Sequence, residues 1–153
     1  MIVPMSPIGV VRSNRSEAID DMWDQVTSTI ELDPSVLDRS ATVGLETFSH
    51  IEVIFVFDGV DPVTVCTGQR HPRGNEHWPS VGILAQRAKD RPNRIGITTC
   101  TLLRVEGLRV HVRGLDAIDG TPVLDIKPFM HEFAPRGAIV QPVWASELMA
   151  QYW

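Results

Sequence analysis

Arg87 and Arg91 stand in a short segment whose backbone chemistry suits a site for charged groups. Pro92 fixes its own φ and biases Arg91 toward an extended conformation, and Asn93 tolerates the left-handed region. Gly96 allows another group to approach the backbone closely. A plain hairpin needs only about two or three turn residues. We therefore expect a turn that holds Arg87 and Arg91 in defined directions.

Three aspartates alternate with apolar residues further along the chain, at positions 116, 119 and 125. Carboxylates among Leu, Ile and Val are costly unless they accept hydrogen bonds or face a cation. Asp119 precedes Gly120 and suits a turn, so a turn-closing role is at least as good an interpretation as catalysis. Asp125 could form an ion pair with Lys127 or cap the backbone. Asp116 is the better functional candidate, because nothing about its position requires a turn.

Basic residues are concentrated in one part of an acidic chain. The net charge of −5 by itself argues against a nucleic-acid partner, because phosphate binding depends on clustered Lys and Arg. Residues 1–65 hold 3 basic and 11 acidic side chains, whereas residues 66–95 hold 6 basic and 2 acidic ones. The second segment could form a positive patch, or its arginines could pair with the acidic half. Its basic side chains are Arg70, Arg73, Arg87, Lys89, Arg91 and Arg94.

Neither a disulfide framework nor a metal site is indicated. Cys66 and Cys100 form no close-spaced pair, and His71 and His77 lack a third ligand at metal spacing. The first residues show no signal-peptide pattern, and no apolar run reaches the roughly 18 to 20 residues that span a bilayer. We expect a soluble protein in the reducing cytoplasm, without a membrane partner.

The dominant period of the hydrophobic residues is two, which predicts strands. The surest strand is 50–58, where β-branched and aromatic residues fill both faces. Turn residues separate the other strands, and Glu106-Gly107 is typical of a tight hairpin turn. Segments 17–23 and 145–152 could each make two turns of helix. The other expected strands are 8–12, 26–32, 81–86, 95–105, 108–112 and 123–126.

Strands spaced this closely predict an all-β barrel or sandwich. The 153 residues suit a single domain, 1–153. Residues 59–80 are rich in Pro, Gly, His and Arg, and such long loops in compact domains are usually functional. Ser49 and His50 could suggest a nucleophile and its base. Neighbouring residues on a strand point to opposite faces, however, so we expect no such pair.

Several short motifs follow one another in a specific order along most of the chain. They are Ile8-Gly9-Val10-Val11-Arg12-Ser13, Gly44-Leu45-Glu46, Phe48-Ser49-His50, Val81-Gly82-Ile83, Arg87, Arg91-Pro92-Asn93, Ile95-Gly96, Leu115-Asp116 and the run from Asp119-Gly120-Thr121 to Pro128. Together they resemble the TrmO (TsaA-like) family, whose members use S-adenosylmethionine to methylate tRNA.

The resemblance implies an all-β fold, a compact antiparallel β-barrel with short peripheral helices and long functional loops. It also implies a homodimer that binds S-adenosylmethionine near the subunit interface, without a Gly-rich nucleotide loop. The chain departs from the family where it lacks a Pro-Arg-Gln segment within 14–30, has Asp58-Gly59 in place of His-Gln, and has Arg94 in place of a proline. The family's cofactor-binding positions correspond to Asp58, Gly59, Arg87, Thr99, Leu115, Asp116, Ala117 and Ile118.

The resemblance further implies methylation of the exocyclic nitrogen of threonylcarbamoyl-modified adenosine next to the anticodon. Methyl transfer needs an in-line nucleophile about 3 to 3.5 Å from the methyl carbon and no covalent residue. We expect Arg91 and Asn93 to face the substrate and Asp116 to accept the released proton. A noncatalytic S-adenosylmethionine- or RNA-binding barrel, or a methyltransferase with another substrate, are the alternatives. The expected contacts to tRNA come from Arg70, Arg73, Asn75, Arg91 and Arg94.

Overall fold

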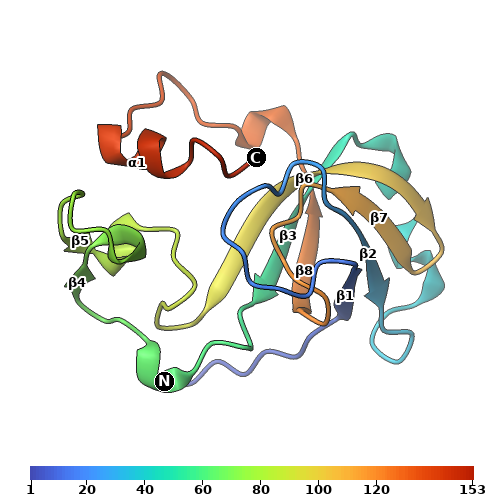
Figure 1. Cartoon of the computed structure of the whole chain (residues 1–153). Coiled ribbons are helices and arrows are strands. Elements are labelled where there is room, and N and C mark those ends of the chain that lie inside the picture. Colours follow the sequence, from blue (N-terminus) through green and yellow to red (C-terminus); the bar gives the residue numbers. More distant parts are fainter.

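Six antiparallel strands close into a barrel in the computed structural model, which describes residues 1–153 (Figure 1). Around the barrel the strand order is β1-β2-β7-β6-β3-β8. The predicted barrel is confirmed, and the sandwich alternative is excluded. The strands are β1 (Gly9–Ser13), β2 (Thr27–Leu32), β3 (His50–Val56), β6 (Ile95–Glu106), β7 (Arg109–Arg113) and β8 (Pro122–Pro128).

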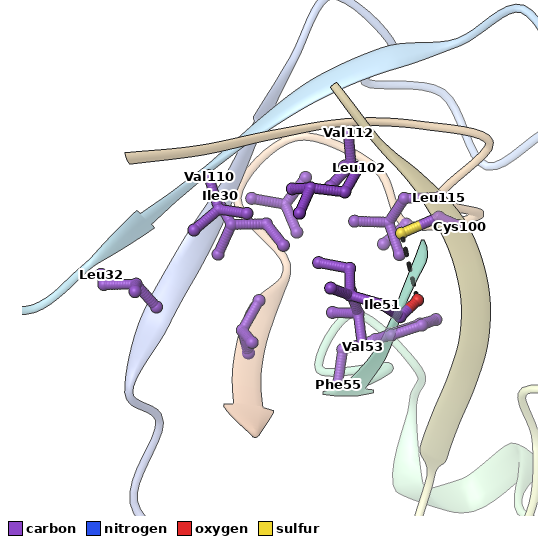
Figure 2. Packing of buried hydrophobic residues seen from close by; sticks show 13 residues of the cluster. Ile30, Leu32, Ile51, Val53, Phe55, Cys100, Leu102, Val110, Val112 and Leu115 are labelled. Carbon is purple, nitrogen blue, oxygen red and sulfur yellow. Dashed lines mark hydrogen bonds between the residues drawn. The ribbon is translucent and has the colours of Figure 1, made fainter. Parts of the chain in front are cut away.

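Alternate side chains of these strands fill the barrel (Figure 2). On β3, Ile51, Val53 and Phe55 are at most 1% exposed, whereas the side chains between them are half-buried. β3 is therefore closed on its inner face and only partly covered on its outer face, which is less burial than the sequence predicted. The thiol of Cys100 on β6 donates to the carbonyl oxygen of Ile51 across the two strands, at 3.7 Å.

Two glycines on the strands are required by the close approach of other groups. A Cβ on Gly9 would lie 2.5 Å from the backbone carbonyl oxygen of Glu31 on the neighbouring strand β2. A Cβ on Gly96 would lie 2.4 Å from the ring of Phe55. The close approach predicted at Gly96 is confirmed, and the group that approaches is an aromatic ring of the core.

The elements outside the barrel are short. β4 (Gln69–Arg70) and β5 (Val81–Gly82) form a separate two-stranded sheet, and α1 (Val143–Leu148) lies near the C-terminal end (Figure 1). The strand predicted over 81–86 ends after β5, because the chain turns into a 3₁₀ helix over Ile83–Ala85 that buries Ile83. The loop 59–80 contains β4 and two 3₁₀ turns rather than a structureless connection.

The predicted helix over 17–23 is wrong. In a helix over 17–23, the carbonyl oxygen of Ile19 would accept from the N–H of residue 23, and the carbonyl oxygens of Asp21 and Met22 would lie free at the helix end. Here the guanidinium of Arg15 donates to all three. Met22 also has a φ of +67°, which no α-helix accommodates. The helix predicted over 145–152 is shorter and begins two residues earlier, as α1.

A two-residue hairpin joins β6 to β7, as predicted, but one position later. Glu106 pairs with Arg109, so Gly107 and Leu108 form the turn. Gly107 has a φ of +61°, a conformation that favours glycine. None of the helices has the length and apolar character needed to cross a membrane.

Candidate functional site

The first half of β6 extends beyond its neighbour β7. β7 ends at Arg113 opposite Thr101, so residues 95–100 of β6 pair with β3 alone. The loop 114–118 follows β7 and reaches this part of β6 through its side chains. An open strand edge beside a loop gives polar side chains a place to converge.

Asp116 in this loop is the centre of a cluster of polar side chains. One of its carboxylate oxygens accepts a hydrogen bond from the hydroxyl of Thr98, which is only 5% exposed on β6. The other accepts a hydrogen bond from the phenol of Tyr152. The half-buried carboxylate is thus held by two hydroxyls from distant parts of the chain.

Tyr152 reaches the cluster because the C-terminal segment packs back onto the protein. The backbone N–H of Trp23 donates to the carbonyl oxygen of Tyr152 at 2.8 Å. In α1, the carboxylate of Glu147 accepts a hydrogen bond from the indole of Trp78 at 2.7 Å. In Figure 1 the C-terminal end returns toward β6. These contacts fix Tyr152 as a wall of the Asp116 cluster.

Burial and the charge of Asp116 keep the neighbouring acidic groups protonated. Burial, followed by the charge of Asp116, raises the pKa of the Cys100 thiol to about 12. The same two causes, together with the hydrogen bond to Asp116, raise the pKa of Tyr152. Cys100 is therefore an inert core thiol at neutral pH, and Tyr152 serves as a hydrogen-bond donor.

Arg87 supplies a positive charge near this cluster. Its Nη2 atom donates to the carbonyl oxygen of Ile97, on the part of β6 that extends beyond β7, at 2.6 Å. Ile97 directly precedes Thr98 of the cluster on β6, and the charge of Arg87 partly offsets the rise in the pKa of Tyr152. The rest of the side chain is exposed. The prediction that the turn holds Arg87 in a defined direction agrees with this contact.

The predicted cofactor residues Asp58 and Gly59 lie exposed just after β3, beside the turn that precedes β6. The N–H of Phe57 donates to the carbonyl oxygen of Arg94 at 2.8 Å, and the Arg94 guanidinium donates to the carbonyl oxygen of Val60 at 3.0 Å. Arg94, with a φ of +51°, is the left-handed residue of the turn, whereas the sequence suggested Asn93. The contact to Val60 holds Arg94 in this conformation.

The other predicted cofactor residues face different directions. Thr99 is exposed on the outer face of β6, opposite Glu52 of β3. Leu115 and Ala117 are buried in the core, at 0% and 3% exposure, and Ile118 is half-buried. Of the loop 114–118, Asp116 alone carries a polar side chain into the cluster.

Two of the arginines that were candidates for tRNA contact pair with acidic side chains. Arg70 forms an ion pair with Asp90 at 2.9 Å, and Arg73 forms one with Asp21 at 2.8 Å. The alternative in which the basic segment pairs with the acidic half therefore describes Arg73, whereas Arg70 pairs with an acidic residue of its own segment.

The remaining candidates for substrate contact form hydrogen bonds within their own turns. Arg91 donates to the carbonyl oxygen of Gln86 at 2.9 Å. The side chain of Asn75 accepts from the N–H of His77 at 3.0 Å. Asn93 is exposed.

Two of the three aspartates have structural roles, although Asp119 binds β1 instead of closing its own turn as the sequence suggested. Asp119 accepts a hydrogen bond from the N–H of Ser13 at 2.9 Å, which ties its turn to β1. Asp125 forms an ion pair with Lys127 at 2.9 Å and also caps the backbone N–H of Ile126. Asp116 remains the aspartate whose contacts point to a site.

Ser49 and His50 do contact each other, contrary to expectation. Ser49 Oγ lies 2.8 Å from His50 Nδ1. β3 begins at His50, so Ser49 precedes the strand and escapes the alternation of its side chains. Both residues are exposed.

Sequence reasoning missed Thr98 and Tyr152. The period-two pattern of β6 contained a signal for Thr98, because it lies on the same face as the buried Gly96 and Cys100. For Tyr152 the signal was weak: it is the only tyrosine of the chain, and its position depends on contacts with residues far away in the sequence.

Most of the chain is similar to known proteins. The profile of the tRNA-methyltransferase O N-terminal domain matches residues 19–134. The chain is 38% identical over 101 residues to the human tRNA (adenine(37)-N6)-methyltransferase. This match covers 66% of this chain and 22% of that protein. It is 36% identical over 141 residues to a "Probable S-adenosyl-L-methionine-binding protein" of Methanothermobacter thermautotrophicus, covering 90% of this chain and 97% of that protein.

The solved structures show the same fold. The crystal structure of TrmO from Pseudomonas aeruginosa matches with a TM-score of 0.72 and 32% identity, covering 91% of this chain and 61% of that one. This chain thus spans only part of the length of the human and Pseudomonas proteins. Because the profile covers most of the chain and the barrel is shared, the chain belongs to the tRNA-methyltransferase O N-terminal domain family.

Proposed function

We propose that this chain is an S-adenosylmethionine-dependent methyltransferase that modifies the exocyclic N6 of an adenine in tRNA. The name of the human relative, tRNA (adenine(37)-N6)-methyltransferase, supports this reaction. The observation that carries the proposal is the cluster beside β6, in which Asp116 is held by two hydroxyls and Arg87 donates to Ile97, the residue before Thr98. The threonylcarbamoyl-modified adenosine next to the anticodon is the substrate that we propose.

The residues of the cluster fit the cofactor. S-adenosylmethionine supplies a methyl group on a positively charged sulfur, and its methionyl end carries an ammonium and a carboxylate. Asp116 offers a half-buried negative charge, and the exposed guanidinium of Arg87 offers donors for a carboxylate. Groups of opposite charge on the cofactor would each find a partner there, with Asp58 and Gly59 at the neighbouring end of β3.

In this proposal the chain accelerates methyl transfer by orientation. Proximity and alignment can supply most of the rate of such a displacement. The turn at Arg91 and Asn93 faces the substrate. Asp116 holds the cofactor and accepts the proton released from N6, because each carboxylate oxygen keeps a lone pair beside the one that accepts from Thr98 or Tyr152.

The direct test is incubation with bulk tRNA and S-adenosylmethionine labelled on its methyl group, followed by mass spectrometry of the nucleosides. We expect label in an N6-methylated adenosine derivative. Calorimetry of Arg87→Ala should show cofactor affinity reduced by roughly tenfold or more, because a charge-assisted hydrogen bond is lost. Arg136→Ala removes an equal charge from an exposed residue and is the control. Equal affinity in Arg87→Ala and the parent would remove Arg87 from the cofactor site.

A noncatalytic S-adenosylmethionine-binding protein is the second candidate. The Methanothermobacter relative favours this candidate. The match to this chain covers 97% of that protein, and its name mentions binding alone. Cofactor binding without label in any tRNA nucleoside would select this candidate. A small-molecule substrate would be indicated by label in other acceptors.

We also propose a homodimer in the cytoplasm, where tRNA is found. Ile97 and Leu84, near Arg87 along the chain, are 42% and 81% exposed, and such apolar side chains suit a subunit contact beside the site. Light scattering should give twice the chain mass. A monomer with full cofactor affinity would contradict a site shared between subunits.

A further inference from the structure

A polar groove of about 620 Å³ runs along the barrel wall formed by β1, β2, β7 and β6. Strand register places Arg12, Thr29, His111 and Arg104 in one row across these strands. In Figure 1 the strands β1, β2 and β7 lie on the side of the barrel away from α1. None of the residues that line the groove belongs to the Asp116 cluster.

Two arginines flank this groove with their terminal nitrogens unpaired. Arg12 pairs with Glu31 through Nε at 3.0 Å, and Arg104 pairs with Glu106 through Nε at 3.4 Å. The arginine side chains are 53% and 63% exposed, so these ion pairs are weak and easily rearranged. Each guanidinium keeps its Nη groups for a bidentate acceptor, the geometry that phosphate oxygens match.

Hydroxyl groups between the arginines add further donors. Thr29 bonds to His111 at 3.0 Å, within the same row. The hydroxyls of Ser13 and Thr27 also line the groove, whereas Ser28 points to the inner face of β2 with Ile30, so its buried hydroxyl lies outside the groove. Asp119 is the acidic residue of the lining, and one of its oxygens is engaged by the N–H of Ser13.

In the basic segment that the sequence suggested for RNA, the arginines use their terminal nitrogens within the protein, whereas the two groove arginines use Nε alone. Arg70 and Arg73 pair with Asp90 and Asp21, and Arg91 bonds to a backbone carbonyl. An RNA-binding surface needs cations whose donors can reach phosphate oxygens. We propose that the groove between Arg12 and Arg104 binds the phosphodiester backbone of RNA. This inference rests on the proposed tRNA substrate and adds a contact surface outside the cofactor site.

The test compares two double variants that each remove two positive charges. Arg12→Ala/Arg104→Ala removes the groove arginines, and Arg39→Ala/Arg136→Ala removes two exposed arginines elsewhere. Binding of bulk tRNA is measured across a salt titration, and cofactor binding is measured by calorimetry. The groove variant should weaken tRNA binding roughly tenfold or more at low salt and reduce the slope of log K against log salt by roughly two. Cofactor affinity should be unchanged, which also shows that the barrel is folded.

The outcomes separate this inference from the proposed function. If both double variants bind tRNA like the parent while the parent still methylates it, the groove is not an RNA site and the proposed function stands. If the groove variant alone loses tRNA binding and the parent transfers no methyl group, the groove stands and the proposed function fails. If both double variants lose the same tRNA affinity, the loss reflects net charge alone, and the proposal that the groove binds RNA is wrong.

Discussion

Replacing Asp116 by alanine is expected to lower the free energy of unfolding by about 3 kcal/mol and cofactor affinity by roughly a hundredfold. The substitution leaves the hydroxyl of Thr98 buried without its acceptor, and it removes the acceptor of Tyr152 as well. Each buried hydroxyl that loses its partner costs about 1 to 3 kcal/mol. Guanidinium denaturation measures the first effect and calorimetry the second.

Asp125→Ala is the matched control for Asp116→Ala. Asp125 pairs with the exposed Lys127 and is itself 46% exposed, so its loss should cost less than about 1 kcal/mol. Tyr152→Phe separates the two effects further, because it removes one hydroxyl and keeps both the ring and the carboxylate. An Asp116→Ala protein as stable as the Asp125→Ala protein would mean that the cluster does not hold the C-terminal segment in place.

Gly9→Ala is expected to destabilise the barrel by about 3 kcal/mol, with a melting temperature lower by roughly 10 °C. The added Cβ would lie 2.5 Å from the carbonyl oxygen of Glu31 and 3.0 Å from the Cα of Leu32. Both are backbone atoms of β2, so no side-chain rotation can relieve the collision. β1 or β2 must shift, and β1 also pairs with β8. Differential scanning calorimetry measures the change.

Gly68→Ala provides the comparison for Gly9→Ala. A Cβ at Gly68 meets nothing within 4 Å, and its φ lies outside the left-handed region. This variant should therefore melt close to the parent. If Gly9→Ala also melts like the parent, the strands accommodate the methyl group and the close packing of β1 on β2 carries little of the stability.

The barrel could be predicted because its signal is local. The alternation of side chains along β3 and β6 is written in consecutive residues, and so is the hairpin at Gly107. Asp116 could also be selected, because a carboxylate among apolar residues with no turn to close is costly without a partner.

The partners of that carboxylate could not be predicted in the same way. Tyr152 contacts Asp116 because the C-terminal segment packs against Trp23, and the sequence around Tyr152 does not encode this packing. The segment 17–23 could make two turns of helix, yet the guanidinium of Arg15 bonds to its carbonyl oxygens and packs over the Trp23 ring at 3.6 Å. The left-handed Arg94 is a third case, since a contact with Val60 decides its conformation. In each case a long side chain overrides the local preference.

The pairing of Trp23 with Tyr152 also sets the order of events during synthesis of the chain. The two residues are separated by most of the sequence, and contacts of such long range form late, because a large loop must close first. The ribosome makes Thr98 and Asp116 before Tyr152, so a nascent barrel can close its strands while the Asp116 cluster still lacks one wall. The cluster is therefore completed only after Tyr152 has left the exit tunnel of the ribosome and packed against Asp116.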